Sequence, residues 1–228
     1  MKILKHLGPV AAFALFPAAT ALATPPTGLD AVIAQMDAAS KTFKSAQADF
    51  TKDIFEKIVS DHTIQKGSLY VERKGADTYM GLNITGAGAT TVEYTPGTVR
   101  QYQPGLKCFN TYSSLNKSSV ESFLTLGFGG SGTELKKNWT ITDQGSETLS
   151  DGKSQVKVEK LDLVGKDQSV RNNFTHVTLW IDPVRGISLK QVFYTPSGDT
   201  QTATYTNIRM GGTIDKKPYA IGGGACHK

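Results

Sequence analysis

Short segments in which apolar and polar residues alternate run through most of the chain, from about residue 45 to residue 210. Examples are AQADFTKDI, TYMGLNITG, THVTLWIDP and ATYTNIRM, and glycine, proline or polar turn residues separate them. A period of two is typical of strands with one buried face, and short turns join antiparallel neighbours. The sequence therefore predicts roughly ten or eleven antiparallel strands.

Two segments favour helices, one before the strands and one that interrupts them. In LDAVIAQMDAASKTFK the apolar residues recur three, four and seven positions apart, which predicts an amphipathic helix. Halfway along the chain Val120, Phe123 and Leu124 recur at helical spacing, and Gly127 stands where that helix would end. A sheet this large must curl, so we expect a mainly β (α+β) fold whose concave face is covered by helices over an apolar cavity.

The stretch from Gly127 to Gly132 matches the G-x-G-x-x-G pattern of dinucleotide-binding loops. Such a loop needs a strand before the glycines, a helix after them and a parallel sheet around them. Here the glycines follow a predicted helix, and no alternation of strands and helices is visible. We therefore predict no phosphate site and interpret the glycines as a flexible connection between two short helices.

The N-terminus has the features of an export signal. Lys2 and Lys5 precede an apolar run that ends in Ala21-Leu22-Ala23, which predicts cleavage near Ala23. A retained membrane anchor is the alternative, but glycine and proline break the run and it is short for a spanning helix. We expect a signal peptide over residues 1–23, a single domain over residues 24–228, and a periplasmic location.

The charge balance gives little support to nucleic-acid binding. Without Lys2 and Lys5 the formal charge falls from +5 to +3, and the basic residues are scattered. The mature chain keeps two cysteines, Cys108 and Cys226, and an exported protein can form disulfides. Pairing them would tether the glycine-rich tail to the middle of the domain, but spacing alone leaves the pairing open.

No arrangement of residues in the sequence points to catalysis. The four histidines have no second ligand at a metal-binding spacing, and no G-x-S-x-G elbow occurs. The carboxylates between residues 49 and 72 alternate with lysines, which is typical of a solvated sheet face. We expect no enzyme activity, no metal and no cofactor; an exported hydrolase would need a reactive serine or an acid pair that the sequence does not reveal.

The insertion in the middle of the chain has more apolar residues than a surface connection needs. Besides Val120, Phe123 and Leu124, it contains Leu126 and Phe128. These side chains either plug the core or form a movable hydrophobic cover. A binding protein with an internal cavity is thus the main functional prediction.

Several segments, in their order, resemble the periplasmic outer-membrane lipoprotein carriers, LolA and its relatives. They are the helix after the signal, SAQADFTK, KGSLYVERKGADTYM, the region of VRQYQPG, ESFLTLGFGGSGTELKKNW, VKVEKLDLVGKD, VTLWIDPVRGISLKQVFY and ATYTNIRM. The resemblance extends from about Leu29 to Met210. It implies an unclosed β-barrel of about eleven strands with a helical lid over a cavity that takes acyl chains.

The resemblance also implies roles for individual residues. Arg73, in YVERKG, matches the family arginine that hydrogen-bonds the lid and holds the empty cavity closed; an ordinary strand arginine is the alternative. We expect the cavity contacts to be Leu69, Val71, Met80, Leu82, Val120, Phe123 and Leu124. Alternation defines their face but not which way it points.

Two segments depart from the family pattern. They are a long polar loop around KDIFEKIVSDHT and the cysteine-bearing tail, which stands in place of a clear final strand. These departures bear on how cargo would pass to a membrane acceptor.

The function implied is that of a soluble periplasmic carrier. It would bind lipoprotein acyl chains and move lipoproteins from the inner to the outer membrane, as a monomer, between an inner-membrane release complex and an outer-membrane acceptor, with no nucleic acid involved. A lipid-sensing regulatory domain or a glycolipid-binding domain on the same fold is the alternative.

Overall fold

The computed structural model describes residues 28–86, 88–113 and 126–226, and within them it contains one twelve-stranded sheet. The first half of the chain forms α1 (Leu29–Thr42), β1 (Ser45–Glu56), β2 (Asp61–Lys74), β3 (Asp77–Thr85), β4 (Thr90–Thr95), β5 (Thr98–Gln103) and β6 (Cys108–Tyr112). The second half forms α3 (Gly132–Asn138), β7 (Trp139–Ser150), β8 (Gln155–Gly165), α4 (Gln168–Asn173), β9 (His176–Asp182), β10 (Ile187–Tyr194), β11 (Thr200–Met210), the 3₁₀ helix η1 (Lys217–Tyr219) and β12 (Gly224–Ala225).

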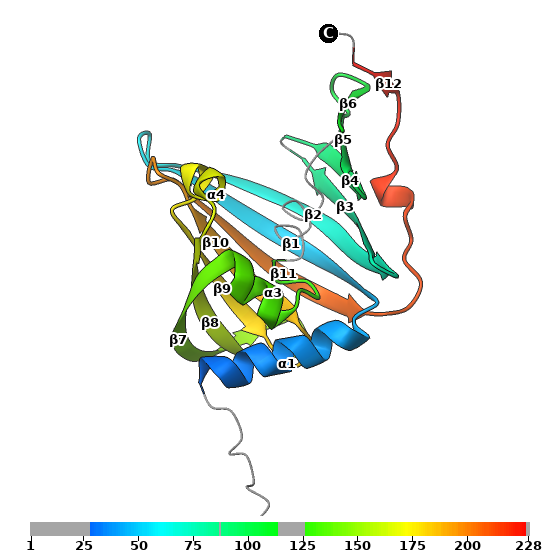
Figure 1. Ribbon diagram of the computed structural model, residues 1–228. Coiled ribbons are helices and arrows are strands. Elements are labelled where there is room, and N and C mark those ends of the chain that lie inside the picture. Colours follow the sequence, from blue (N-terminus) through cyan, green and yellow to red (C-terminus); the bar gives the residue numbers. More distant parts are fainter. Residues whose placement is uncertain (1–27, 87, 114–125, 227–228) are drawn as a thin grey trace, which may run out of the picture.

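The sheet curls strongly but does not close. Its strand order is β12-β6-β5-β4-β3-β2-β1-β11-β10-β9-β8-β7, so β12 and β7 are separate edges. Figure 1 shows the two arms of the sheet bending toward each other, with α1 and α3 at one end of the space between them. The predicted mainly β fold, a curved unclosed sheet with helices, is confirmed. The strand that takes the count beyond eleven is β12, a two-residue strand that pairs parallel to β6.

The predicted polar loop around KDIFEKIVSDHT is wrong, because these residues extend the hairpin of β1 and β2. The two strands pair in one continuous register from Ser45 opposite Glu72 to Glu56 opposite Asp61. The turn is short, and Ser60 within it has a left-handed φ of 51°. Polar residues occur here because the end of the hairpin projects beyond the core, not because the chain leaves the sheet.

The helix α1 lies where its predicted apolar face meets the rest of the domain. Val32, Ile33 and Met36 are buried, while Asp30 in the first turn and Lys41 in the last turn complement the helix dipole. The buried side chains form two clusters. One lies on the concave face of the central strands around Phe43, and the other joins α1 and α3 to β7, β8 and β9.

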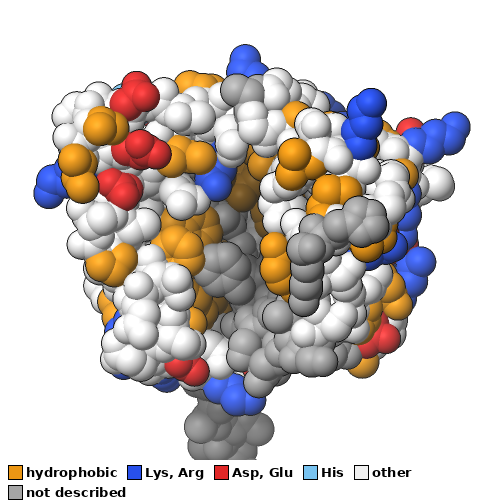
Figure 2. All heavy atoms as spheres, turned by 90° about the horizontal axis from the view of Figure 1, so that it is seen from above, with side chains coloured by type: hydrophobic (Ala, Val, Ile, Leu, Met, Phe, Trp, Pro, Cys, Tyr) orange, Lys and Arg blue, Asp and Glu red, His pale blue; other side chains and the backbone are white. Residues whose placement is uncertain are grey.

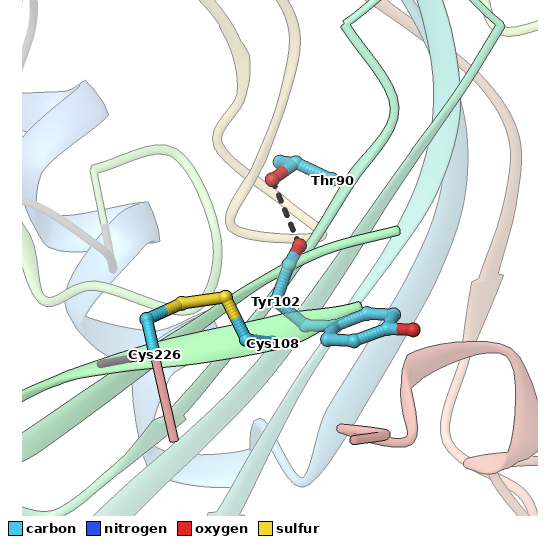
Figure 3. Close-up of a disulfide and its surroundings, with 4 residues drawn as sticks. All are labelled: Thr90, Tyr102, Cys108 and Cys226. Atoms are coloured by element: carbon cyan, nitrogen blue, oxygen red, sulfur yellow. Dashed lines mark hydrogen bonds between the residues drawn. A yellow bond between two sulfur atoms is a disulfide. The ribbon is translucent and has the colours of Figure 1, made fainter. Parts of the chain in front are cut away.

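The C-terminal tail returns along the outer face of the sheet to the far edge. In η1 the ring of Tyr219 packs edge-on against Tyr70, with 4.9 Å between ring centroids, and its hydroxyl donates to Ser68 Oγ over 3.0 Å. Beyond it, Cys226 forms a disulfide with Cys108 of β6, with a Cα–Cα separation of 4.9 Å. Figure 3 shows this bond beside Tyr102 of β5. The tail that the sequence left unplaced therefore completes one edge of the sheet.

Among the described residues, no helix has both the length and the apolar character needed to cross a bilayer.

Candidate functional site

The concave face of the sheet is built by residues two apart on neighbouring strands. Leu69 pairs with Leu82 across β2 and β3, and Val71 pairs with Met80. Paired residues point to the same side of a sheet. The structure thus brings these four predicted cavity residues together on one surface. Alternation did not show which way this face points, and in the structure it points into the cavity.

A cavity of about 250 Å³ lies over this surface. Its lining is mostly apolar and comes from both arms of the sheet: Phe50, Lys52, Leu69, Val71, Met80, Leu82, Ile84, Leu126, Phe128, Phe174, Gln191, Phe193, Gln201, Ala203 and Tyr205. Figure 2 shows hydrophobic side chains gathered inside the hollow on this side of the molecule. A concave site with an apolar lining and a few polar groups is typical of a small-molecule pocket.

The other three predicted cavity residues, Val120, Phe123 and Leu124, lie outside the described residues. The end of the same insertion is described, and there Leu126 and Phe128 line the cavity while being only 3% exposed. The ring of Phe128 meets that of Tyr205 edge-on at 5.0 Å. The described end of the insertion therefore forms part of the cavity wall.

The glycines after Leu126 are held against β10 and the turn before it, which corrects the prediction of a flexible connection. Ser188 donates its amide to the Gly127 carbonyl over 2.6 Å, and Gly129 donates to the Gly186 carbonyl over 2.8 Å. Gly127 and Gly129 have φ values of 88° and 72°, and a Cβ atom on Gly129 would collide with the ring of Phe43. Glycine is needed here for the left-handed backbone and for the close approach to Phe43.

Arg73 lies on the concave face two residues beyond Val71 and joins α1 to the segment before α3. Its guanidinium donates to the Ser40 carbonyl over 2.8 Å and to the Gly129 carbonyl over 2.7 Å, and it stands 5.5 Å from the centre of the Phe43 ring. Ser40 is in the last turn of α1, where unpaired carbonyls and the helix dipole favour a cation. Through these hydrogen bonds Arg73 connects α1 to the segment before α3 across one end of the cavity.

A second set of hydrogen bonds connects α1 to the start of α3 at the same end. Asp37 of α1 accepts hydrogen bonds from Ser131 Oγ over 2.6 Å, from the Thr133 amide over 2.9 Å and from Thr133 Oγ1 over 2.6 Å. Burial raises the pKa of the Asp37 carboxyl, but the hydrogen bonds from Ser131 and Thr133 outweigh it and hold the pKa below the ordinary 3.8. The carboxylate is therefore the stable form at neutral pH.

The polar groups deep in the cavity satisfy one another. Tyr205 donates its hydroxyl to Gln191 Oε1 over 3.0 Å, and Gln191 Nε2 donates to the Leu126 carbonyl over 2.5 Å. Burial raises the pKa of the Tyr205 hydroxyl, so it remains a neutral donor. This chain of bonds fixes the end of the insertion to β10 and β11.

The described histidines each face one carboxylate. His62 lies 2.9 Å from Asp53, and His176 lies 2.7 Å from Asp162. Across residues 28–86, 88–113 and 126–226, no group of three His, Cys, Asp or Glu side chains is placed to hold a metal ion.

Several lining residues were not found from the sequence. On β1 the alternation in AQADFTKDI places Ala46, Ala48 and Phe50 on one face, and that face continues to Lys52. The period was visible, but a lysine in an alternating strand normally indicates the solvent side. Phe174 and Phe193 come from the opposite arm, and only tertiary structure brings them into the cavity.

Comparisons with known proteins show the fold and no closer relationship. No family model and no curated protein matches the sequence. In the complex of Pseudomonas aeruginosa MucA and MucB, the matching chain is 12% identical, with a TM-score of 0.50 over 85% of this chain and 61% of that one. MucB crystallised by itself gives a TM-score of 0.53, also at 12% identity, over 85% of this chain and 62% of that one.

Two further solved structures match over nearly their whole length. A conserved protein from Thermus thermophilus is 9% identical, with a TM-score of 0.52 over 86% of this chain and 97% of that one. A LolA superfamily protein from Nitrosomonas europaea is 12% identical, with a TM-score of 0.38 over 84% and 97%. The chain spans only about three fifths of the length of MucB. What it shares with the MucB and Thermus thermophilus structures is the curved, unclosed sheet with its helices.

Proposed function

We propose that this protein is a periplasmic carrier that shelters acyl chains of lipoproteins in the cavity and moves them between the inner and outer membranes. The observation that carries the proposal is the apolar cavity between the arms of the sheet, with Leu69, Val71, Met80 and Leu82 on its floor. Burial contributes about 0.8 kcal/mol per methylene group, so an acyl chain needs no covalent attachment to be retained.

Arg73 gives the carrier a way to close when empty. It joins Ser40 at the end of α1 to Gly129 before α3, and the acceptors in these two contacts are neutral carbonyls. A ligand that fills the cavity can displace these contacts without separating an ion pair between the groups. Binding and release then need only a modest rearrangement at one end of the sheet.

A second candidate is a regulatory domain that senses lipid and binds a protein partner. It is supported by the likeness to MucB, which has been solved in complex with MucA. In such a protein the cavity would control the partner surface instead of transporting cargo. A complex that stays intact after removal of lipid favours this candidate.

The test is native mass spectrometry of the mature protein purified from its own periplasm, with identification of the released ligand. Ala203 lines the cavity, so Ala203→Phe should occupy space there and reduce the bound acyl mass. Thr204→Phe is the matched control, because the next residue of β11 faces out of the sheet and is exposed. Circular dichroism checks that both variants are folded.

Acylated lipoprotein released from the wild type and from Thr204→Phe, but depleted in Ala203→Phe, is the expected result. A wild-type protein that emerges empty and takes up no acylated cargo from membranes overturns the carrier proposal. If the same empty protein captures a protein partner from the periplasm, the regulatory domain becomes the better explanation.

A further inference from the structure

Lys52 is a charged residue on a face that is otherwise apolar. It follows Ala46, Ala48 and Phe50 at intervals of two along β1, and it lines the cavity with Gln201 of β11. Arg73 is on the same face at the end closed by α1, whereas Lys52 lies toward the projecting end of the β1–β2 hairpin. The two cations therefore stand at opposite ends of the concave surface.

The two cations also differ in their surroundings. Arg73 donates to carbonyl oxygens, but no described residue forms a hydrogen bond or an ion pair with the ammonium group of Lys52. Its neighbours in sequence point to the outer face, where Asp53 pairs with His62. Burial lowers the pKa of Lys52, which indicates an ammonium group with part of its hydration removed.

The surface around Lys52 changes from apolar to polar toward the open end of the sheet. A second hollow adjoins the cavity and shares Lys52 and Ile84 with it. Glutamine amides line this hollow from β2 and β5, namely Gln65, Gln101 and Gln103. Among the described residues that line either space, Lys52 is the one charged group, and no carboxylate balances it.

We propose that the ligand is an anionic amphiphile, whose acyl chain occupies the cavity while its carboxylate or phosphate group pairs with Lys52. An anionic oxygen would give the ammonium a charge-assisted hydrogen bond, and the amides supply further donors. A neutral head group would leave a partly dehydrated cation without a counter-ion. The inference rests on the proposed function, since it requires an acyl chain in the cavity.

The test measures displacement of the neutral fluorophore 1-N-phenylnaphthylamine from the delipidated mature protein. Palmitate is compared with palmityl alcohol, and palmitoyl-lysophosphatidylglycerol with monopalmitoylglycerol, so that carboxylate and phosphate heads are tested separately against neutral ones. Lys52→Met keeps most of the side-chain length but removes the charge. Lys66→Met is the matched control, because Lys66 is an exposed lysine beside Gln65 on the opposite face of β2.

The wild type should bind at least one anionic ligand about tenfold more tightly than its neutral counterpart, with an affinity that falls as salt is added. Lys52→Met should lose that factor and the salt dependence while keeping its affinity for the alcohol, which also shows that the cavity is intact. Lys52→Arg and Lys66→Met should resemble the wild type. Whichever head group shows the effect identifies the source of the anion.

Two failures are distinguishable. If acid and alcohol bind equally well to the wild type and to Lys52→Met, the charge inference is overturned and the acyl-binding function stands. If neither the anionic nor the neutral ligands displace the fluorophore, both the inference and the proposed function are overturned.

Discussion

Arg73 joins α1 to the segment before α3, and in the proposed carrier these contacts would break when the cavity opens. Two of its acceptors are the carbonyl oxygens of Ser40 and Gly129, and neither of these two is ionised. A hydrogen bond with one charged partner contributes about 1.5–3 kcal/mol to stability, and water replaces it when the groups separate. In the proposed carrier the Arg73 side chain would therefore stabilise the closed form without preventing exchange of ligand.

We expect Arg73→Leu to lower the free energy of unfolding of the empty protein by about 1–3 kcal/mol. It should also tighten binding of an acyl probe, because opening would no longer break these two hydrogen bonds. Urea unfolding and fluorophore displacement measure the two effects. Arg73→Lys should fall in between, since one ammonium lacks the planar fork that serves two carbonyls. Unchanged stability and affinity in the leucine variant would contradict the role.

Gly129 is required for two separate reasons, and a second glycine allows them to be separated. Its φ is 72°, and an added Cβ would strike the ring of Phe43; Gly97 has a similar φ of 79° with nothing within 4 Å. Gly97→Ala should cost about 1 kcal/mol from backbone strain alone. Gly129→Ala should cost clearly more, because Phe43 must also move. Equal urea midpoints for the two variants would show that the ring contact is unimportant.

At the scale of elements, α1 and α3 depend on the carboxylate of Asp37, so their association should depend on pH. The pKa of Asp37 is below 3.8 in the folded protein, because hydrogen bonds from Ser131 and Thr133 outweigh the effect of burial. Such a group stabilises the fold at pH values above its unfolded pKa, and this contribution is lost as the pH falls through the lower, folded pKa.

We expect Asp37→Asn to lower the free energy of unfolding at about pH 7, with a smaller difference from the wild type at about pH 3. Urea unfolding at several pH values in this range measures the difference. Glu56→Gln is a suitable control, because Glu56 is exposed at the far end of β1, away from α1 and α3. A difference that stays constant through the acid range would show that the Asp37 carboxylate is not what joins α1 to α3.

The elements could be predicted from the sequence where a periodic pattern coincides with burial. The three- and four-residue spacing of Val32, Ile33 and Met36 predicted α1, and the structure buries that face. The alternation around Leu69 and Val71 predicted a strand face and its cavity contacts. The hairpin end near Ile58 was not predicted as strand, because its pairing is local and it has no buried face to impose a period.

The parts of the site that could not be predicted depend on long-range geometry. Lys52 obeys the same alternation as Phe50, but only the curvature of the sheet turns that position into the wall of a cavity. Arg73 was found through the resemblance, and its contacts with Ser40 and Gly129 join segments that are 33 and 56 residues away in sequence. Local patterns contain no information about such distances.

For the whole molecule, the tail and the disulfide determine how one edge of the sheet is protected. β12 has only two residues, and the amide of Cys226 donates to the Phe109 carbonyl over 2.9 Å. A strand this short has few contacts, so the covalent bond to Cys108 keeps it beside β6. Without β12, β6 would present an open edge, which is a site for pairing with other chains. Tyr219 anchors the preceding part of the tail independently.

We expect replacement of both Cys108 and Cys226 by serine to lower the free energy of unfolding by about 2–4 kcal/mol, because the bond closes a long loop in the unfolded chain. The two cysteines are 118 residues apart. In hydrogen exchange, β12 should lose protection while the region of Tyr219 and Tyr70 keeps it, since their ring contact and the Tyr219 hydrogen bond remain. Reduced wild-type protein should behave like the double variant. If Tyr219 were released together with β12, the disulfide would hold the entire tail, and the contacts of η1 would be too weak to act as a separate anchor.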